Sequence, residues 1–187
     1  MTSPGHVIEN PLSGERITVT ARPRRAGDAL AWELVLAPGG RVPGSHSHPE
    51  QTERFTVLEG RLRFRAGRRR IVAGPGDVVV IPPGTVHHFA NAGPGPARVA
   101  VTSRPALGTE AMLETAAALA RDQRAAGRAW PRPLDLALFL GDFRHELRAP
   151  YLPGFGVRAA LWPVRALARS LGRDRRYRRL RAGRAGD

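Results

Sequence analysis

Three histidines and one glutamate in the first half of the chain have the side chains and the spacing of a metal site. His46 and His48 are separated by one residue, so on an extended strand both imidazoles point to the same face. Glu53 follows far enough along for a bend to return its carboxylate to the same interior, and His87 follows a Pro-Pro-Gly turn that can aim the next strand inward. Three imidazoles and one carboxylate suit a divalent first-row transition metal. Four protein ligands on an octahedral ion leave two positions for water or substrate, as a catalytic site requires.

The other polar residues near this set are expected to have ordinary roles. Glu50 can serve as an alternative ligand or a proton shuttle, but its setting favours a solvated turn residue. His88 directly follows His87, and adjacent residues of a strand face opposite ways, so His88 is expected to point away from the metal. His6 and His145 have no partners in the sequence.

Three arginines, Arg61, Arg63 and Arg65, alternate with Leu62 and Phe64. This pattern predicts a solvated outer face of a strand. If the arginines instead faced a cavity mouth, they would favour an anionic substrate.

Composition removes several kinds of chemistry. The chain of 187 residues has no cysteine, which excludes disulfides, thiolate catalysis and cysteine-held zinc. It also has no lysine, so all 30 basic residues are arginine, and Schiff-base and P-loop lysines are absent. The net charge of +14 therefore reflects an arginine-rich composition and is weak evidence for nucleic-acid binding.

The two halves of the chain differ in their pattern. Up to residue 104, short β-like runs are separated by Gly- and Pro-rich turns, which indicates an antiparallel sandwich or barrel. After Pro105 the apolar spacing becomes helical and predicts three helices, from Thr109 to about Gly127, over Leu134–Leu147, and up to Leu171. We therefore divide the chain into a barrel domain (1–104), a helical extension (105–172) and an Arg-rich, flexible tail (173–187). Examples of these β-like runs are Arg16–Thr20, Ala29–Ala37, Glu53–Leu58, Arg61–Arg65, Val78–Ile81 and Ala97–Thr102.

The histidine-bearing segments resemble the two motifs of the cupin superfamily. The first reads Gly40-(five residues)-His46-Ser47-His48-(four)-Glu53-(six)-Gly60. The second reads Gly76-(five)-Pro82-Pro83-Gly84-(two)-His87-(three)-Asn91. The resemblance covers roughly residues 7–104, and 15 residues separate the motifs, as in short microbial cupins.

This resemblance implies a mainly β protein, with a cupin (RmlC-like jelly-roll) antiparallel β-barrel that is commonly dimeric. It implies that His46, His48, Glu53 and His87 are the metal ligands. Further positions take structural roles in the motifs: Gly60 and Gly76 as turn residues, Pro82 and Gly84 before His87, and Asn91 as a turn or outer-shell group. The helical half is similar to extensions on other bacterial cupins, a similarity that implies no activity.

The functional expectation is a metal-dependent cupin acting on a small organic molecule, with dioxygenase-type chemistry favoured and Glu53 able to act as a base. Iron(II) is the favoured ion, and Mn²⁺, Ni²⁺, Zn²⁺ and Co²⁺ also suit the site. Isomerase or cyclase chemistry with the metal as a Lewis acid is the alternative, as is a non-catalytic metal-bound cupin that binds a ligand.

The expected partners are a small-molecule substrate and a second copy of the chain, in a homodimer. No nucleic acid is expected, and the Arg-rich tail, whose one aromatic residue is Tyr177, is not expected to hold the protein on a membrane. No signal peptide is visible near Met1, so the expected location is the cytoplasm.

Overall fold

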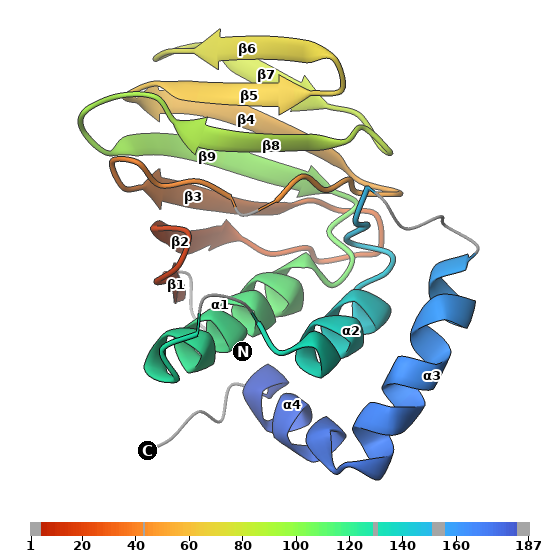
Figure 1. The fold of residues 1–187 in the computed structure, drawn as a ribbon. Coiled ribbons are helices and arrows are strands. Elements are labelled where there is room, and N and C mark those ends of the chain that lie inside the picture. Colours follow the sequence, from red (N-terminus) through yellow and green to blue (C-terminus); the bar gives the residue numbers. More distant parts are fainter. Residues whose placement is uncertain (1–4, 43, 129–130, 151–155, 183–187) are drawn as a thin grey trace.

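The computed structural model describes residues 5–42, 44–128, 131–150 and 156–182, with backbone alone at 156–161 and 165. Over these residues the chain forms nine strands and then four helices (Figure 1). The strands are β1 (Val7–Asn10), β2 (Glu15–Ala21), β3 (Leu30–Leu36), β4 (Thr52–Glu59), β5 (Leu62–Ala66), β6 (Arg69–Ala73), β7 (Val78–Ile81), β8 (His87–Asn91) and β9 (Ala97–Arg104). The helices are α1 (Thr109–Ala125), α2 (Pro133–Asp142), α3 (Gly156–Ser170) and α4 (Arg173–Arg181).

The strands form two antiparallel sheets. The larger sheet has the order β1-β2-β3-β9-β4-β7, and the smaller has the order β6-β5-β8. In Figure 1 the smaller sheet lies in front of β7, β4 and β9, so the two sheets enclose an interior between them. Because β4 and β5 are consecutive but lie in different sheets, the chain crosses from one sheet to the other, as a jelly roll requires. The predicted mainly β jelly roll followed by a helical extension is confirmed.

The interior is filled by side chains that alternate along the strands. On β3 every second residue, from Leu30 to Leu36, is buried. Three aromatic rings, those of Phe55 (β4), Phe64 (β5) and Phe89 (β8), pack together with centroids 5.1–5.5 Å apart. Aromatic pairs at this spacing add to the stabilisation that burial alone provides, so this cluster ties the two sheets together.

The helices form a second core below the barrel. α1 lies against β1 (Figure 1), and Arg22 of the loop after β2 donates to Glu110 of α1 at 2.6–3.0 Å. The buried apolar residues of this second core come from α1, α2, α3, α4 and the turn after α2: Met112, Leu138, Phe139, Phe143, Ala168 and Tyr177. In the part of the chain that the structure describes, none of the helices has the length and apolarity to cross a membrane.

The structure differs from the sequence expectation at two places in the extension. α2 ends at Asp142 and not at Leu147, because residues 143–148 turn back toward the barrel, where Arg148 pairs with Ser47. A fourth helix, α4, forms where we predicted a flexible tail. Tyr177 in α4 is only 1% exposed, and its burial holds α4 against the other helices, which the Arg-rich composition did not predict. The last part of the predicted tail, 183–187, lies outside the described residues.

Candidate metal centre

Backbone pairing between the segment before β4 and strand β8 brings the three predicted histidines together, and β4 adds the glutamate. The segment around His46 pairs with β8, where His46 and His87 exchange backbone hydrogen bonds of 3.0 and 2.8 Å. The carbonyl of His48 accepts a 2.8 Å hydrogen bond from Gly84, at the predicted turn before His87. Glu53 lies on β4 in the other sheet. The site therefore sits where the end of one sheet meets the end of the other.

The three imidazoles form a compact cluster. Nitrogen atoms of His46, His48 and His87, one from each ring, all lie within 4.8 Å of one another, a group that could hold a metal ion. Their ring centroids are 4.5–5.3 Å apart. One carboxylate oxygen of Glu53, Oε2, lies 3.1 Å from Nε2 of His48 and 3.1 Å from Nε2 of His87. His48, His87 and Glu53 are buried and His46 is half-buried, so the site faces solvent on the side of His46.

Backbone carbonyls fix which nitrogen of each ring faces the centre. Nδ1 of His48 lies 2.5 Å from the carbonyl of Glu146, and Nδ1 of His87 lies 3.0 Å from that of Thr85. A carbonyl oxygen can only accept, so Nδ1 carries the proton and Nε2 of the neutral ring keeps its lone pair. His46 follows the same arrangement with a longer contact, 3.4 Å, to Gly44.

The chemistry of this donor set fits a cation. With Nδ1 protonated, the Nε2 lone pairs of His48 and His87 both face the Glu53 carboxylate, which itself can only accept. Nε2 of His48 is buried and has no hydrogen-bond partner. Buried acceptors that face one another are unfavourable unless a proton or a metal ion lies between them.

The electrostatics of the site agree with this. Burial by itself would raise the pKa of Glu53, but in the metal-free protein a proton on Nε2 of His48 or His87 supplies a hydrogen bond and a positive charge that outweigh burial and hold the pKa well below its usual range. Burial and the neighbouring His87 and His48 lower the pKa of His46 to about 4. Burial also acts to lower the pKa of His48, yet the Glu53 carboxylate 3.1 Å away favours the protonated ring and raises it overall. At neutral pH the centre thus offers an anionic carboxylate and a neutral His46.

The remaining sequence expectations can also be placed. His88 is half-buried, and its Nδ1 lies 3.0 Å from Oγ of Ser45. Glu50 is exposed and pairs with His145 at 2.9 Å, as expected of a solvated turn residue. Asn91 holds a turn, since its Nδ2 donates to three backbone carbonyls and its Oδ1 accepts from Gly93.

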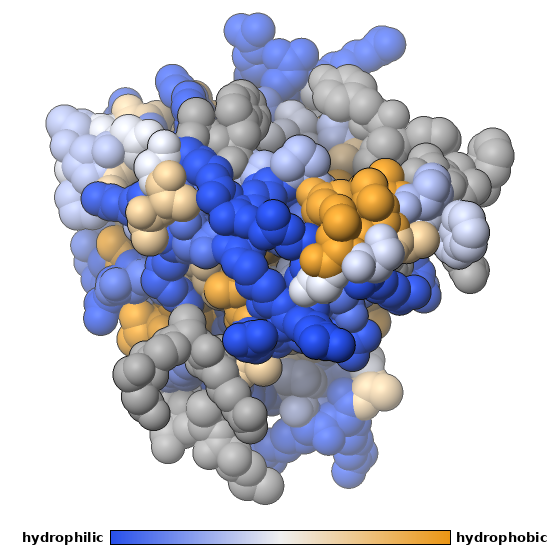
Figure 2. Space-filling model, turned by 60° about the horizontal axis from the view of Figure 1, so that its bottom comes forward, coloured by the Kyte–Doolittle hydropathy of each residue, from blue (hydrophilic) through white to orange (hydrophobic). Residues whose placement is uncertain are grey.

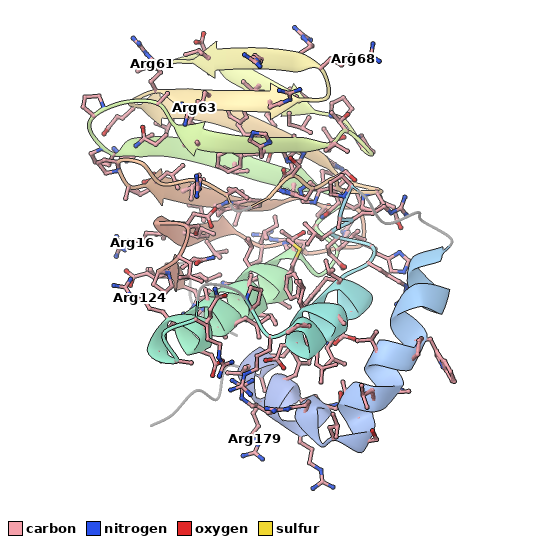
Figure 3. All side chains as sticks on the ribbon, in the orientation of Figure 1. Arg16, Arg61, Arg63, Arg68, Arg124 and Arg179 are labelled. Atoms are coloured by element: carbon pink, nitrogen blue, oxygen red, sulfur yellow. The ribbon has the colours of Figure 1, made fainter. Side chains whose placement is uncertain are left out.

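The alternating arginines of β5 lie on the outer face. Arg61, just before the strand, and Arg63 and Arg65 within it are all exposed. In Figure 3 the side chain of Arg61 points away from the body of the molecule, at the end of the sheet. These three arginines therefore do not line the mouth of a cavity, which was the alternative considered from the sequence.

Contacts between the helical extension and the barrel were missed by sequence reasoning. The carbonyl of Glu146 orients His48, as described above, and the neighbouring Arg148 forms an antiparallel bridge with Ser47, with hydrogen bonds of 2.8 and 3.0 Å. Gln51, between the histidines and Glu53, donates to the carbonyls of Pro105 and Ala106 and to Thr109 at the start of α1. The extension therefore touches the segment that carries the first two histidines.

The sequence and fold were compared with known proteins. The model of a family described as "Cupin domain" matches residues 32–103. Germin-like protein subfamily T member 3 of Arabidopsis thaliana is 40% identical over 67 residues, which are 33% of this chain and 29% of that protein. Germin-like protein 1-1 of Oryza sativa subsp. japonica is 40% identical over 90 residues, 44% of this chain and 40% of that protein. The chain thus spans less than half the length of these curated relatives.

Solved structures resemble the barrel in fold. KdgF from Halomonas sp. has a TM-score of 0.49 at 19% identity and covers 56% of this chain and 93% of its own. TT1209 from Thermus thermophilus has a TM-score of 0.46 at 25% identity, with coverages of 52% and 88%. Pac13 from Streptomyces, described as a nucleoside dehydratase, has a TM-score of 0.47 at 18% identity, with coverages of 57% and 81%. Similarity at this level says nothing about activity.

Proposed function

Because the chain belongs to the cupin family through residues 32–103, we propose that it holds one divalent transition-metal ion and acts on a small organic molecule. The ligands in this proposal are His46, His48, His87 and Glu53. The observation that carries it is the meeting of buried imidazole nitrogens and a buried carboxylate at 3.1 Å, an arrangement that a metal ion between them would satisfy. Of the ions that this mixed nitrogen and oxygen set suits, we propose iron(II).

Each ligand would have a distinct task. His48 and His87 are locked by their Nδ1 contacts and would hold the ion with Nε2. Glu53 would supply the negative charge and, when it loosens from the ion, would accept a proton from the substrate. His46 is the half-buried ligand, so the substrate would approach on its side. The bound ion would supply a Lewis acid and, as iron(II), a centre for dioxygen chemistry.

The interior beside the ligands is apolar, and we propose an apolar or aromatic substrate. Phe55 lies two residues after Glu53 on β4, and Phe89 lies two residues after His87 on β8. Residues two apart on a strand share a face, so both rings continue the interior surface that carries the ligands. They are buried and keep water away from that side. Oxygenase-type chemistry on a phenolic or diketone compound is the reaction class that we propose.

Metal analysis tests the ligand set. Protein purified without added metal is expected to carry close to one equivalent of a transition metal, and His48→Ala is expected to lose most of it. Glu53→Gln should keep more metal than His48→Ala, because a neutral oxygen ligand remains. His88→Ala is the matched control, since His88 is a half-buried histidine that bonds Ser45. Equal metal in His48→Ala and the wild type would overturn the assignment.

Oxygen consumption tests the reaction class. The metal-loaded protein is screened against phenolic and diketone compounds with an oxygen electrode, with the metal-depleted His48→Ala protein as the blank. Turnover with stoichiometric oxygen uptake supports the oxygenase proposal. Turnover without oxygen uptake assigns isomerase or cyclase chemistry instead, with the metal as a Lewis acid.

A further inference from the structure

The helical extension carries on its surface a cavity of about 590 Å³ that is wide open to solvent. It lies between the segment that follows α1, the beginning of α2 and the beginning of α4, three parts of the chain that pack together (Figure 1). Its lining includes Arg128, Arg132, Asp135 and Arg173, and no residue of the candidate metal centre. The cavity is therefore a separate feature of the molecule.

The three arginines that line this cavity have no acidic partner among the residues that the structure describes. Arg128, Arg132 and Arg173 are all half-buried. Within the described ranges no carboxylate lies in salt-bridge distance of any of them. The two nearby carboxylates, Asp122 and Asp135, both pair with a fourth arginine, Arg176.

The charges around the cavity are unbalanced. Four arginines (128, 132, 173 and 176) stand against two aspartates (122 and 135), which leaves two net positive charges. Nε of Arg132 is buried without a hydrogen-bond partner. Burial, together with repulsion from Arg176, Arg128 and Arg173, lowers the pKa of the Arg132 guanidinium. Partly buried guanidinium groups that crowd together without anions are unfavourable, so the cavity has a deficit of negative charge.

Two helix ends add to the positive field. α2 begins at the cavity, with Arg132 at its N-cap and no side chain capping its first N–H groups. α4 begins there too, with Arg173 as its first residue and again no capping side chain. Free N–H groups and the dipole at a helix N-terminus favour a negative charge. Each helix also has one aspartate in its first turn, Asp135 in α2 and Asp174 in α4, but each of these is already paired with an arginine. The helix ends and the lining arginines therefore favour a negative charge in the same place.

We propose that this cavity binds a phosphate group, carried by a phosphomonoester or a diphosphate. The fork of N–H groups on arginine matches phosphate oxygens in pairs, and Arg128, Arg132 and Arg173 would supply three such forks. A phosphomonoester carries close to two negative charges at pH 7, which balances the net charge of the cluster. The volume leaves room for more of the ligand than the phosphate itself.

Calorimetric titration with inorganic pyrophosphate tests the site in the full chain. The wild type is expected to bind one equivalent, and Arg132→Gln and Arg173→Gln are each expected to weaken binding by about tenfold or more, because each removes charge-assisted hydrogen bonds. The face of the molecule shown in Figure 2 is largely hydrophilic, with a prominent apolar patch, so binding at this site must be distinguished from nonspecific attraction of an anion to the basic surface. Arg179→Gln is the matched control: Arg179 lies on α4 as well, but it is exposed and points away from the helices (Figure 3).

A second measurement needs no variant. Phenylglyoxal modifies accessible arginines, and pyrophosphate should protect Arg132 and Arg173 from it but not Arg179, as read by mass spectrometry. Absence of saturable binding, equal weakening by Arg179→Gln, or equal modification with and without pyrophosphate would each overturn the proposal. Vesicles containing phosphatidic acid distinguish the sources of the phosphate. If the protein binds these vesicles and pyrophosphate displaces it, the phosphate belongs to a lipid headgroup. If the protein binds pyrophosphate but not the vesicles, the ligand is a soluble phosphate compound.

Discussion

Glu146 connects the helical extension to the barrel, and its replacement gives a sharp prediction. Its carboxylate accepts a 2.9 Å hydrogen bond from the N–H of Gly108, before α1, and its carbonyl accepts from His48. A hydrogen bond to a charged group contributes about 1.5–3 kcal/mol. The N–H of Gly108 is half-buried and water can partly replace the carboxylate, so we expect Glu146→Ala to cost about 1.5 kcal/mol. For a chain of this size that lowers the melting temperature by about 3–6 °C.

The same change should weaken metal binding. Without the anchor at Gly108 the carbonyl of Glu146 is free to shift, and the ring of His48 loses its fixed orientation. Loss of such an outer contact to a ligand histidine lowers metal affinity by about tenfold to a hundredfold. Because the carbonyl itself remains in Glu146→Ala, we expect the lower figure, about tenfold.

Thermal unfolding followed by circular dichroism measures the first effect, and competition with a metal-binding dye measures the second. Glu146→Gln keeps an acceptor for the N–H of Gly108 and should lie between the wild type and Glu146→Ala. Glu50→Ala is the surface control, since Glu50 and its partner His145 are each 53% exposed and such pairs contribute less than about 1 kcal/mol. If Glu146→Ala and Glu50→Ala give equal melting temperatures and equal metal affinities, the extension does not support the site.

Three further predictions concern the barrel. In the metal-free protein the pKa of His46 is about 4, against an ordinary value of 6.5. The unfolded chain therefore takes up the proton first, and the free energy of unfolding falls as the pH drops from 6.5 toward 4, by up to about 2 kcal/mol at pH 5 from this residue. Urea unfolding at pH 7 and pH 5 should show a smaller fall in His46→Gln, and an equal fall in both proteins would contradict the pKa. Asn91→Asp replaces an amide that donates to three backbone carbonyls with a buried carboxyl group that has no donor when ionised and only one O–H when protonated, so calorimetry should show a loss of about 3 kcal/mol or more, and an unchanged melting temperature would contradict this. Gly60→Ala should destabilise more than Gly67→Ala: both have positive φ, but an added Cβ meets the backbone of Ala97 at 2.8 Å at the first site and nothing within 4 Å at the second, so equal melting temperatures would show that the barrel relaxes around the clash.

The barrel and the cluster of histidines could be predicted because their signals are local. His46 and His48 share a face by alternation, and the turn at 82–84 precedes His87 directly, so residue type and spacing together describe the site. The predicted run Val78–Ile81 agrees with β7 at both ends, whereas β1, β6 and β8 were not among the runs named from the sequence. Each of these features depends on residues that are close in sequence, or on two motifs whose spacing is itself visible.

The contribution of the extension to the site could not be predicted, for a definite reason. The group of Glu146 that meets His48 is a backbone carbonyl, which every residue has, so no residue type marks it. The bridge between Ser47 and Arg148 is likewise made by backbone atoms about a hundred residues apart. Contacts of this kind are set by how α2 ends and where the turn after it is placed.

The Arg-rich end of the chain likewise separates what the sequence predicts from what tertiary packing decides. Its composition alone predicted a flexible tail, because residues 158–187 contain ten arginines and only one tyrosine, the residue that anchors α4 to the other helices. Packing of Tyr177 against α1 and α2 brings α4 into the second core and places Arg173 beside Arg128 and Arg132. The sequence by itself therefore determined the barrel and which side chains can bind a metal, since those depend on alternation and spacing. Only the tertiary structure decided which carbonyl orients His48 and which arginines share a cavity, because those contacts join segments that no local pattern relates.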